Sequence, residues 1–113
     1  DISGTEMMET DCTDVNFTNA NLSEANFKHA LLKSVCFVNA KMGDVDFRGA
    51  RFIECDFSGA ELIEAKFNGV DLSSVKNISA EELQSAILDS ETKVPDYIKV
   101  HWKSEDTYEC ELV

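Results

Sequence analysis

The side chains that could carry out nucleophilic or acid–base chemistry are few in this chain, and they lie far apart in the sequence. Its two histidines are His29 and His101, and neither sits in a recognisable arrangement with a nucleophile or with metal ligands. The sequence has no glycine-rich phosphate loop, no HExxH motif and no GxSxG motif. A surface role for His29 is therefore favoured over general-base catalysis. The sequence predicts no enzyme, no catalytic residue, no metal site and no cofactor.

The four cysteines are the other reactive groups. Cys12, Cys36, Cys55 and Cys110 show no CxxC spacing, which argues against a zinc ribbon or thioredoxin-like chemistry. Within the repeat described next, Cys12 and Cys55 fall at inward positions, so we expect both to pack as core thiols. Cys36 falls at an outward position, and a bridge between Cys36 and Cys110 stays open.

The elements that must position these groups come from a five-residue repeat. From Val15 to Ser74 the chain repeats twelve units without an insertion. Each unit has a small residue, a mostly polar residue, a large apolar residue and two variable positions. Unbroken repetition of this kind is typical of a solenoid, in which each unit contacts mainly its neighbours. The predicted core consists of the large positions Phe17, Leu22, Phe27, Leu32, Phe37, Met42, Phe47, Phe52, Phe57, Leu62, Phe67 and Leu72.

A period of five fits neither an amphipathic helix nor a simple strand, which need apolar spacings near 3.6 and 2. It fits a short extended run followed by a corner. The pattern resembles the pentapeptide-repeat family, whose right-handed quadrilateral β-helix uses four units, or twenty residues, for each coil. This resemblance implies an all-β solenoid of about three to three and a half coils over residues 1–76. Residues 1–10 are expected to form an N-terminal cap, in which Ile2 and Met7 continue the large position.

Twenty-residue stacking can be checked within the sequence. It would place Phe17, Phe37 and Phe57 in one ladder and Phe27, Phe47 and Phe67 in the opposite ladder. It would also place opposite charges side by side, pairing Lys41 with Glu61, Asp46 with Lys66, and Arg51 with Asp71. Exposed pairs contribute only about 0.2 to 1 kcal/mol each, so they indicate register more than stability.

Residues 77–113 depart from the repeat and are expected to close the end of the last coil. Ser79 and Glu82 form a capping-box pattern, which predicts a helix from about Ala80 to Leu88. Its apolar face would consist of Leu83, Ala86 and Ile87. After Pro95, alternating apolar residues predict an extended or hairpin tail.

The C-terminal region is the candidate interface. Its apolar residues are Leu83, Ile87, Tyr97, Ile98, Trp102 and Tyr108. If they are exposed, the chain is a protein–protein interaction or scaffolding module, and a homodimer through the C-terminal end is one form of it. The alternative is that these residues pack on the helix and complete the cap.

The net charge of −12 suggests a second function class. Some members of the resembled family act as acidic mimics of duplex DNA that bind gyrase or another type II topoisomerase. Here, however, residues 11–76 carry ten acids and seven bases, so the coil surface is close to balanced. One acidic ladder is expected, at Glu24, Asp44 and Glu64. Direct binding of nucleic acid is not expected. Membrane insertion is not expected either, because no apolar run reaches membrane-spanning length.

The cysteine pattern slightly favours a reducing, cytoplasmic compartment. The chain begins at Asp1 without Met, so a removed targeting sequence stays open. In that case the resemblance also allows a periplasmic or thylakoid-lumenal location.

Overall fold

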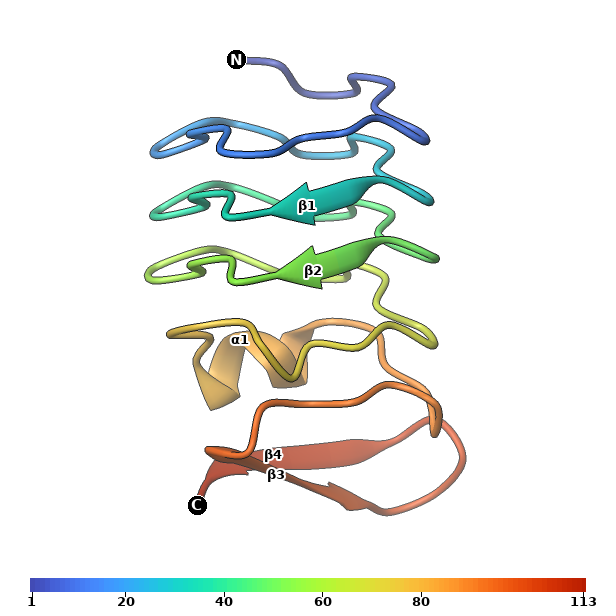
Figure 1. Cartoon of the computed structure of the whole chain (residues 1–113). Helices are drawn as coiled ribbons and strands as arrows, with labels where there is room; N and C mark the ends of the chain where they lie inside the picture. Colours follow the sequence, from blue (N-terminus) through green and yellow to red (C-terminus); the bar gives the residue numbers. More distant parts are fainter.

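The structure, a computed structural model, describes residues 1–113. Its elements are β1 (Leu31–Lys33), β2 (Arg51–Ile53), α1 (Ala80–Ser85), β3 (Ile98–Trp102) and β4 (Tyr108–Leu112). Figure 1 shows flat coils stacked along one axis, with α1 and the β3–β4 hairpin at the C-terminal end. The molecule measures 35 × 22 × 20 Å.

The coils repeat every twenty residues, as the sequence predicts. Strands β1 and β2 pair in parallel, with Leu32 opposite Phe52. The same offset of twenty relates the isolated bridges on the other sides, from Glu6 with Asn26 to Asp56 with Lys76. Residues 1–10 belong to this ladder, because Ile2 N–H donates to the Asn21 carbonyl. They continue the hydrogen-bonded ladder at the N-terminal end of the stack.

The corner of each unit has a left-handed backbone. From Gly4 to Gly69 every fifth residue has a positive φ, among them Glu24 (φ 63°), Asp44 (φ 59°) and Glu64 (φ 60°). At most corners the following N–H closes the turn, as Ala25 N–H does on the Leu22 carbonyl (3.0 Å). A positive φ at the third residue of such a turn defines type II. These turns make the five-residue unit a geometric unit.

The predicted core residues are all buried, with at most 8% of any of them exposed. Both phenylalanine ladders form, with ring centroids 5.6 Å apart for Phe17 and Phe37 and 5.4 Å apart for Phe27 and Phe47. Phe52 lies in a column that otherwise holds Cys12, Leu32 and Leu72, and its ring contacts Phe47 and Phe57.

The helix is shorter than predicted. It ends at Ser85, because Ala86 is extended (φ −82°, ψ 175°). The next residue, Ile87, is hydrogen-bonded to the coil before it. Its N–H donates to the Ala65 carbonyl, and its carbonyl accepts from Phe67 N–H. Side chains alternate along extended backbone, so Ala86 and Leu88 are buried and Ile87 is exposed. The predicted apolar helix face therefore fails at Ile87.

The capping box is realised only in part. Glu82 N–H donates to Ser79 Oγ (3.0 Å), but the Glu82 carboxylate does not return to Ser79. It accepts instead from the Leu62 N–H of the coil above.

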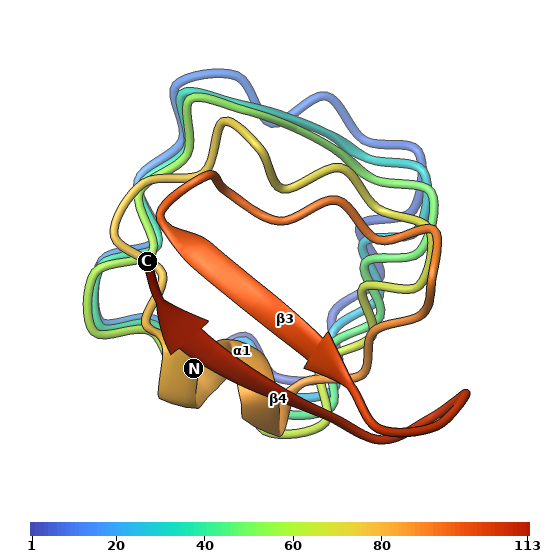
Figure 2. The same ribbon diagram turned by 90° about the horizontal axis from the view of Figure 1, so that it is seen from below.

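The β3–β4 hairpin lies across the last coil, as Figure 2 shows. Its antiparallel register places Val100 opposite Cys110 and Trp102 opposite Tyr108. Ile98 is buried against the coil stack, whereas Lys99 on the other face is exposed. No helix of the chain has the length and apolar character needed to cross a membrane.

Candidate functional site

The C-terminal residues expected to form an interface occupy three different environments. Leu83 is fully buried and only 4% of Ile98 is exposed, so both belong to the core and cannot contact a partner. Tyr97 and Tyr108 are half-buried, and Ile87 and Trp102 are exposed, at 38% and 40%.

The two tyrosine hydroxyls fasten the tail to the coils. Tyr97 OH donates to the Val75 carbonyl (2.8 Å) and accepts from Ile78 N–H (3.2 Å). Tyr108 OH donates to the Ala86 carbonyl. Burial raises the pKa of both phenols. The tyrosines therefore support the alternative weighed from the sequence, in which the cluster completes the end of the stack.

Trp102 stays exposed beside the half-buried ring of Tyr108, and we call these two residues the C-terminal surface. The ring centroids of Trp102 and Tyr108 are 5.0 Å apart. The hydroxyl of Tyr108 brings this pair to Ala86, the residue before Ile87.

Beside the C-terminal surface, the outer face of the hairpin is charged. His101 Nε2 lies 2.9 Å from Glu111 Oε1, and the hydrogen bond from His101 lowers the pKa of Glu111. Lys103 and Glu109 lie 3.9 Å apart. The exposed apolar side chains of the two strands are Trp102 and Leu112.

The acidic ladder is present as stacked corners. Glu24 N–H donates to the Gly43 carbonyl, and Asp44 N–H donates to the Ile63 carbonyl one coil further on. All three carboxylates, including that of Glu64, are exposed. No group of three or more His, Cys, Asp or Glu side chains is arranged to hold a metal ion.

The predicted charge ladders align in the backbone but not in their side chains. Lys41 bridges Glu61, and Asp46 bridges Lys66, yet no ion pair joins either couple. Asp46 pairs instead with Arg48 at 2.7 Å within its own unit. Partial burial would raise the pKa of Asp46, but the hydrogen bonds and charge of Arg48 outweigh it and lower that pKa. Since Arg48 is two residues away in the same unit, it reaches Asp46 without crossing to the next coil.

All four cysteines are free thiols. Cys12 and Cys55 are buried as predicted, and Cys55 Sγ lies 3.0 Å from the Leu32 carbonyl. Cys36 is half-buried, with Sγ 3.1 Å from Thr18 Oγ1. No disulfide joins Cys36 to Cys110.

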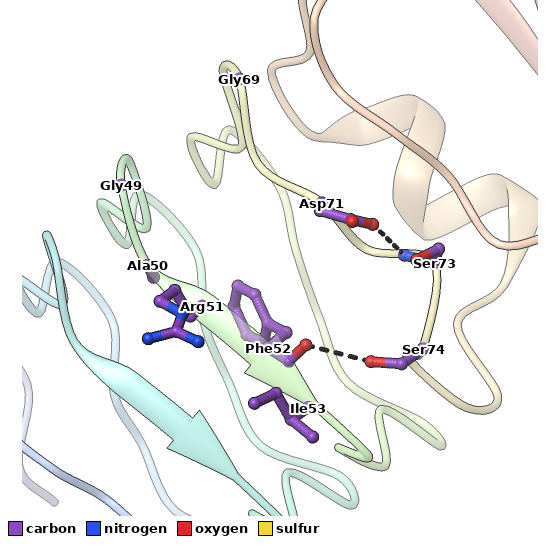
Figure 3. Close-up of a pocket in the computed structure, with 9 residues that line it drawn as sticks. All are labelled: Gly49, Ala50, Arg51, Phe52, Ile53, Gly69, Asp71, Ser73 and Ser74. Carbon is purple, nitrogen blue, oxygen red and sulfur yellow. Dashed lines mark hydrogen bonds between the residues drawn. The ribbon is translucent and has the colours of Figure 1, made fainter.

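A cleft that the sequence did not predict opens on the face of the stack that carries β2. Its volume is about 440 Å³, and Figure 3 shows the nine residues that line it. The upper wall is Gly49–Ile53 and the lower wall consists of Gly69, Asp71, Ser73 and Ser74. Arg51 and Asp71, predicted to pair, lie on opposite walls of this cleft and form no ion pair.

The cleft exists because the coil ladder is broken there. No backbone–backbone hydrogen bond joins residues 49–54 to residues 68–74. In the same column the N–H groups of Cys12 and Leu72 both donate to the next coil, whereas Phe52 finds no carbonyl below it. Only the Ser74 hydroxyl spans the gap, donating to the Phe52 carbonyl (3.0 Å) and accepting from Glu54 N–H (3.3 Å). The one local signal was Phe52 itself, a ring in an aliphatic column.

The comparisons with known proteins agree with this architecture. A family model described as a pentapeptide repeat region matches residues 10–85. No curated protein matches the chain.

Several solved structures are similar. A pentapeptide repeat protein from the thylakoid lumen of Arabidopsis thaliana superimposes with a TM-score of 0.66 at 22% identity, over 84% of this chain and 58% of that chain. HetL, a pentapeptide repeat protein involved in heterocyst differentiation regulation from the cyanobacterium Nostoc, gives 0.53 at 21% identity, over 66% of this chain and 36% of that chain. QnrB1, a plasmid-mediated fluoroquinolone resistance protein, superimposes with a TM-score of 0.52 at 23% identity, over 84% of this chain and 53% of that chain. The chain thus spans less than two thirds of each of these relatives, and the likeness concerns the fold.

Proposed function

This chain belongs to the pentapeptide-repeat family of right-handed β-helix solenoids, and on that premise we propose that it is a non-enzymatic module that binds another protein. The architecture behind the proposal is a stack of repeat coils with α1 and the hairpin at its C-terminal end. Such a stack holds its surface side chains at fixed spacings, which lowers the entropy lost on binding.

One observation carries the proposal: Trp102 is 40% exposed at the edge of a hairpin whose outer face is charged. Its ring rests on Tyr108, whose hydroxyl is bonded to the coil stack. A rigid, half-exposed tryptophan surrounded by polar groups has the character of an interface hot spot.

The test compares the wild-type chain with Trp102→Ala as bait in an extract of the organism of origin, followed by titration of each recovered protein in pure form. We expect a partner whose affinity falls by about thirtyfold or more in Trp102→Ala, the loss typical of a hot spot of about 2 kcal/mol. The matched control is Met8→Ala, which removes an exposed apolar side chain at the opposite end of the stack. The proposal fails if no purified protein distinguishes Trp102→Ala from the wild type.

A second copy of this chain is one form of the proposed partner. Light scattering on the pure protein separates this case, because a dimer that dissociates on Trp102→Ala identifies self-association. The point substitution is preferable to removal of the tail, since Ile98 and the Tyr97 hydroxyl belong to the folded end of the stack.

The alternative function is acidic mimicry of DNA directed at a type II topoisomerase such as gyrase. The stacked, exposed carboxylates of Glu24, Asp44 and Glu64 favour it. The 35 Å length of the molecule corresponds to about ten base pairs, and Arg48, which pairs with Asp46, places a positive charge four residues after Asp44. A salt-sensitive inhibition of gyrase supercoiling that is lost when the three ladder acids become Gln or Asn would support this alternative over the first.

A further inference from the structure

We propose that the cleft between β2 and Asp71–Ser74 binds an extended peptide segment of a partner protein, which pairs with the backbone groups that the broken ladder leaves free. This site is separate from the C-terminal surface and does not depend on it. We call it the ladder-break cleft, lined by Gly49–Ile53, Gly69, Asp71, Ser73 and Ser74.

The free groups are of the kind that an added strand satisfies. Neither Gly49 N–H nor Asp71 N–H has an acceptor, and Phe52 N–H has none on the coil below. The carbonyls of Ala50 and Asp71 accept no backbone hydrogen bond. Peptides that add to a sheet edge gain affinity from such main-chain groups and selectivity from alternate side chains.

The dimensions agree with a short segment. The cleft volume of about 440 Å³ lies within the range of roughly 300 to 1,000 Å³ found for ligand pockets. Strand β2 has three residues, and an extended segment of that length spans about 10 Å.

The lower wall of the cleft is hydrogen-bonded to the segment that follows it in the stack. Leu72 N–H donates to the Lys93 carbonyl (2.8 Å), and Lys93 N–H donates to the Val70 carbonyl (3.0 Å). In the upper wall, Phe52 replaces the leucine found above and below it, and its ring is wedged against Phe47 and Phe57. Overpacking of this kind displaces backbone, which accounts for the slight exposure of Ala50 and Phe52, 6% and 5%.

Side chains at the cleft give it a polarity. Asp71 Oδ1 accepts from Ser73 N–H (2.9 Å), and the hydrogen bonds from Ser73 lower the pKa of Asp71. Its carboxylate is thus a fixed negative charge on the lower wall. Arg51 on the upper wall has no ion-pair partner, and Ile53 offers an apolar contact. We infer a segment with a basic side chain directed at Asp71, an acidic one at Arg51, and an apolar one between them.

The experiment uses the full chain and a phage-displayed library of linear random heptapeptides. Selected peptides are synthesised and titrated, while amide hydrogen exchange is followed by NMR. We expect peptides that slow exchange at Gly49, Phe52 and Asp71 by about tenfold or more, as a new main-chain hydrogen bond requires. A library that gives no binder, or binders that leave these amides unchanged, overturns the proposal.

Two variants and one control sharpen the result. Phe52→Leu restores the leucine of the column and should let the ladder close, so peptide affinity should fall by at least about tenfold and the Asp71 amide should become protected without peptide. Phe17→Leu makes the same substitution at a buried position in an earlier coil, where the ring contacts Phe27 and Phe37, and it should leave affinity within about twofold. Arg51→Glu changes only an exposed side chain and should weaken peptides that carry an acidic residue. Unchanged binding by both Phe52→Leu and Arg51→Glu would contradict the proposal and leave the C-terminal surface unaffected.

Discussion

The carboxylate Oε2 of Glu82 accepts a hydrogen bond from the backbone N–H of Leu62 at 2.8 Å. In the coils above, Leu22 and Met42 hold the position of Leu62, and their N–H groups donate to backbone carbonyls. Helix α1 directs its own carbonyls along its axis, so a side chain supplies the missing acceptor. Asp89 does the same for Gly69 N–H (3.0 Å). Two carboxylates thus complete the ladder where the repeat ends.

Replacing Glu82 should destabilise the chain more than its surface position suggests. Leu62 is fully buried, so Glu82→Ala leaves its N–H without a partner, at a cost of about 1 to 3 kcal/mol. Glu82→Gln keeps an acceptor oxygen, so its free energy of unfolding should lie between those of the wild type and Glu82→Ala. The matched control is Glu81→Ala in the same helical turn, which should cost less than about 0.5 kcal/mol. Urea unfolding measures all three, and equal losses at Glu81 and Glu82 would contradict the assignment.

Asp89 should make stability depend on pH. Burial would raise its pKa, but hydrogen bonds from Gly69, Glu91 and Thr92 outweigh this effect and lower the pKa. A carboxyl group with a lowered folded pKa stabilises the fold above its unfolded pKa of about 3.9 and loses this contribution as the pH falls through the folded value.

The test is Asp89→Asn. The wild type should be the more stable at pH 7, and the difference should shrink as the pH falls below about 4. Asp96→Asn, at an exposed carboxylate that accepts no hydrogen bond, is the control. A constant difference across this range would show that the charge of Asp89 is not the stabilising feature.

The corner glycines should differ in their tolerance of alanine. Gly49 (φ +76°) and Gly69 (φ +70°) have the same left-handed backbone, which costs an alanine roughly 1 to 2 kcal/mol. A Cβ at Gly49 would also overlap the ring of His29, whereas one at Gly69 would meet nothing within 4 Å. Gly49→Ala should therefore be the more destabilising, and a His29→Ala background should remove the difference. Denaturant midpoints measure these stabilities. If Gly49→Ala stays more destabilising than Gly69→Ala by the same amount in the His29→Ala background, the His29 contact is excluded as the cause.

The four thiols should react in a fixed order with a disulfide reagent. Burial raises the pKa of Cys12, Cys55 and Cys110, and the thiolate is the reactive form. Cys36 should react first, Cys110 more slowly, and the two core thiols only on unfolding. Cys36→Ser should abolish the fast phase, and a fast phase that persists would place the accessible thiol elsewhere.

The core and the twenty-residue register could be predicted because each five-residue unit by itself specifies which of its residues face the core. A small and a large residue at fixed positions direct Phe37 and Phe47 inward whatever the neighbouring units contain. The corners also have a sequence signal, because the fifth position of the unit is rich in Asn, Asp and Gly, which tolerate a positive φ.

The sites could not be predicted because they depend on contacts between coils. Helical periodicity placed Ile87 inward, but its hydrogen bonds to Ala65 and Phe67 impose extended backbone and turn it outward. Local capping rules directed Glu82 to Ser79, whereas Leu62 twenty residues earlier binds it. The ladder-break cleft is lined by two segments about twenty residues apart, Gly49–Ile53 and Gly69–Ser74, which no single window of sequence contains.

The ladder spacing also sets a timetable for synthesis. A typical N–H of one coil donates to a carbonyl nineteen residues later, as Phe17 does to Cys36 and Met42 to Glu61. At about 5 to 20 residues per second on the ribosome, each coil therefore waits roughly 1 to 4 s for the next. The nascent chain can form its coils in order from the N-terminus, and the coil that is hydrogen-bonded to Glu82 and Asp89 is the last to gain its partners.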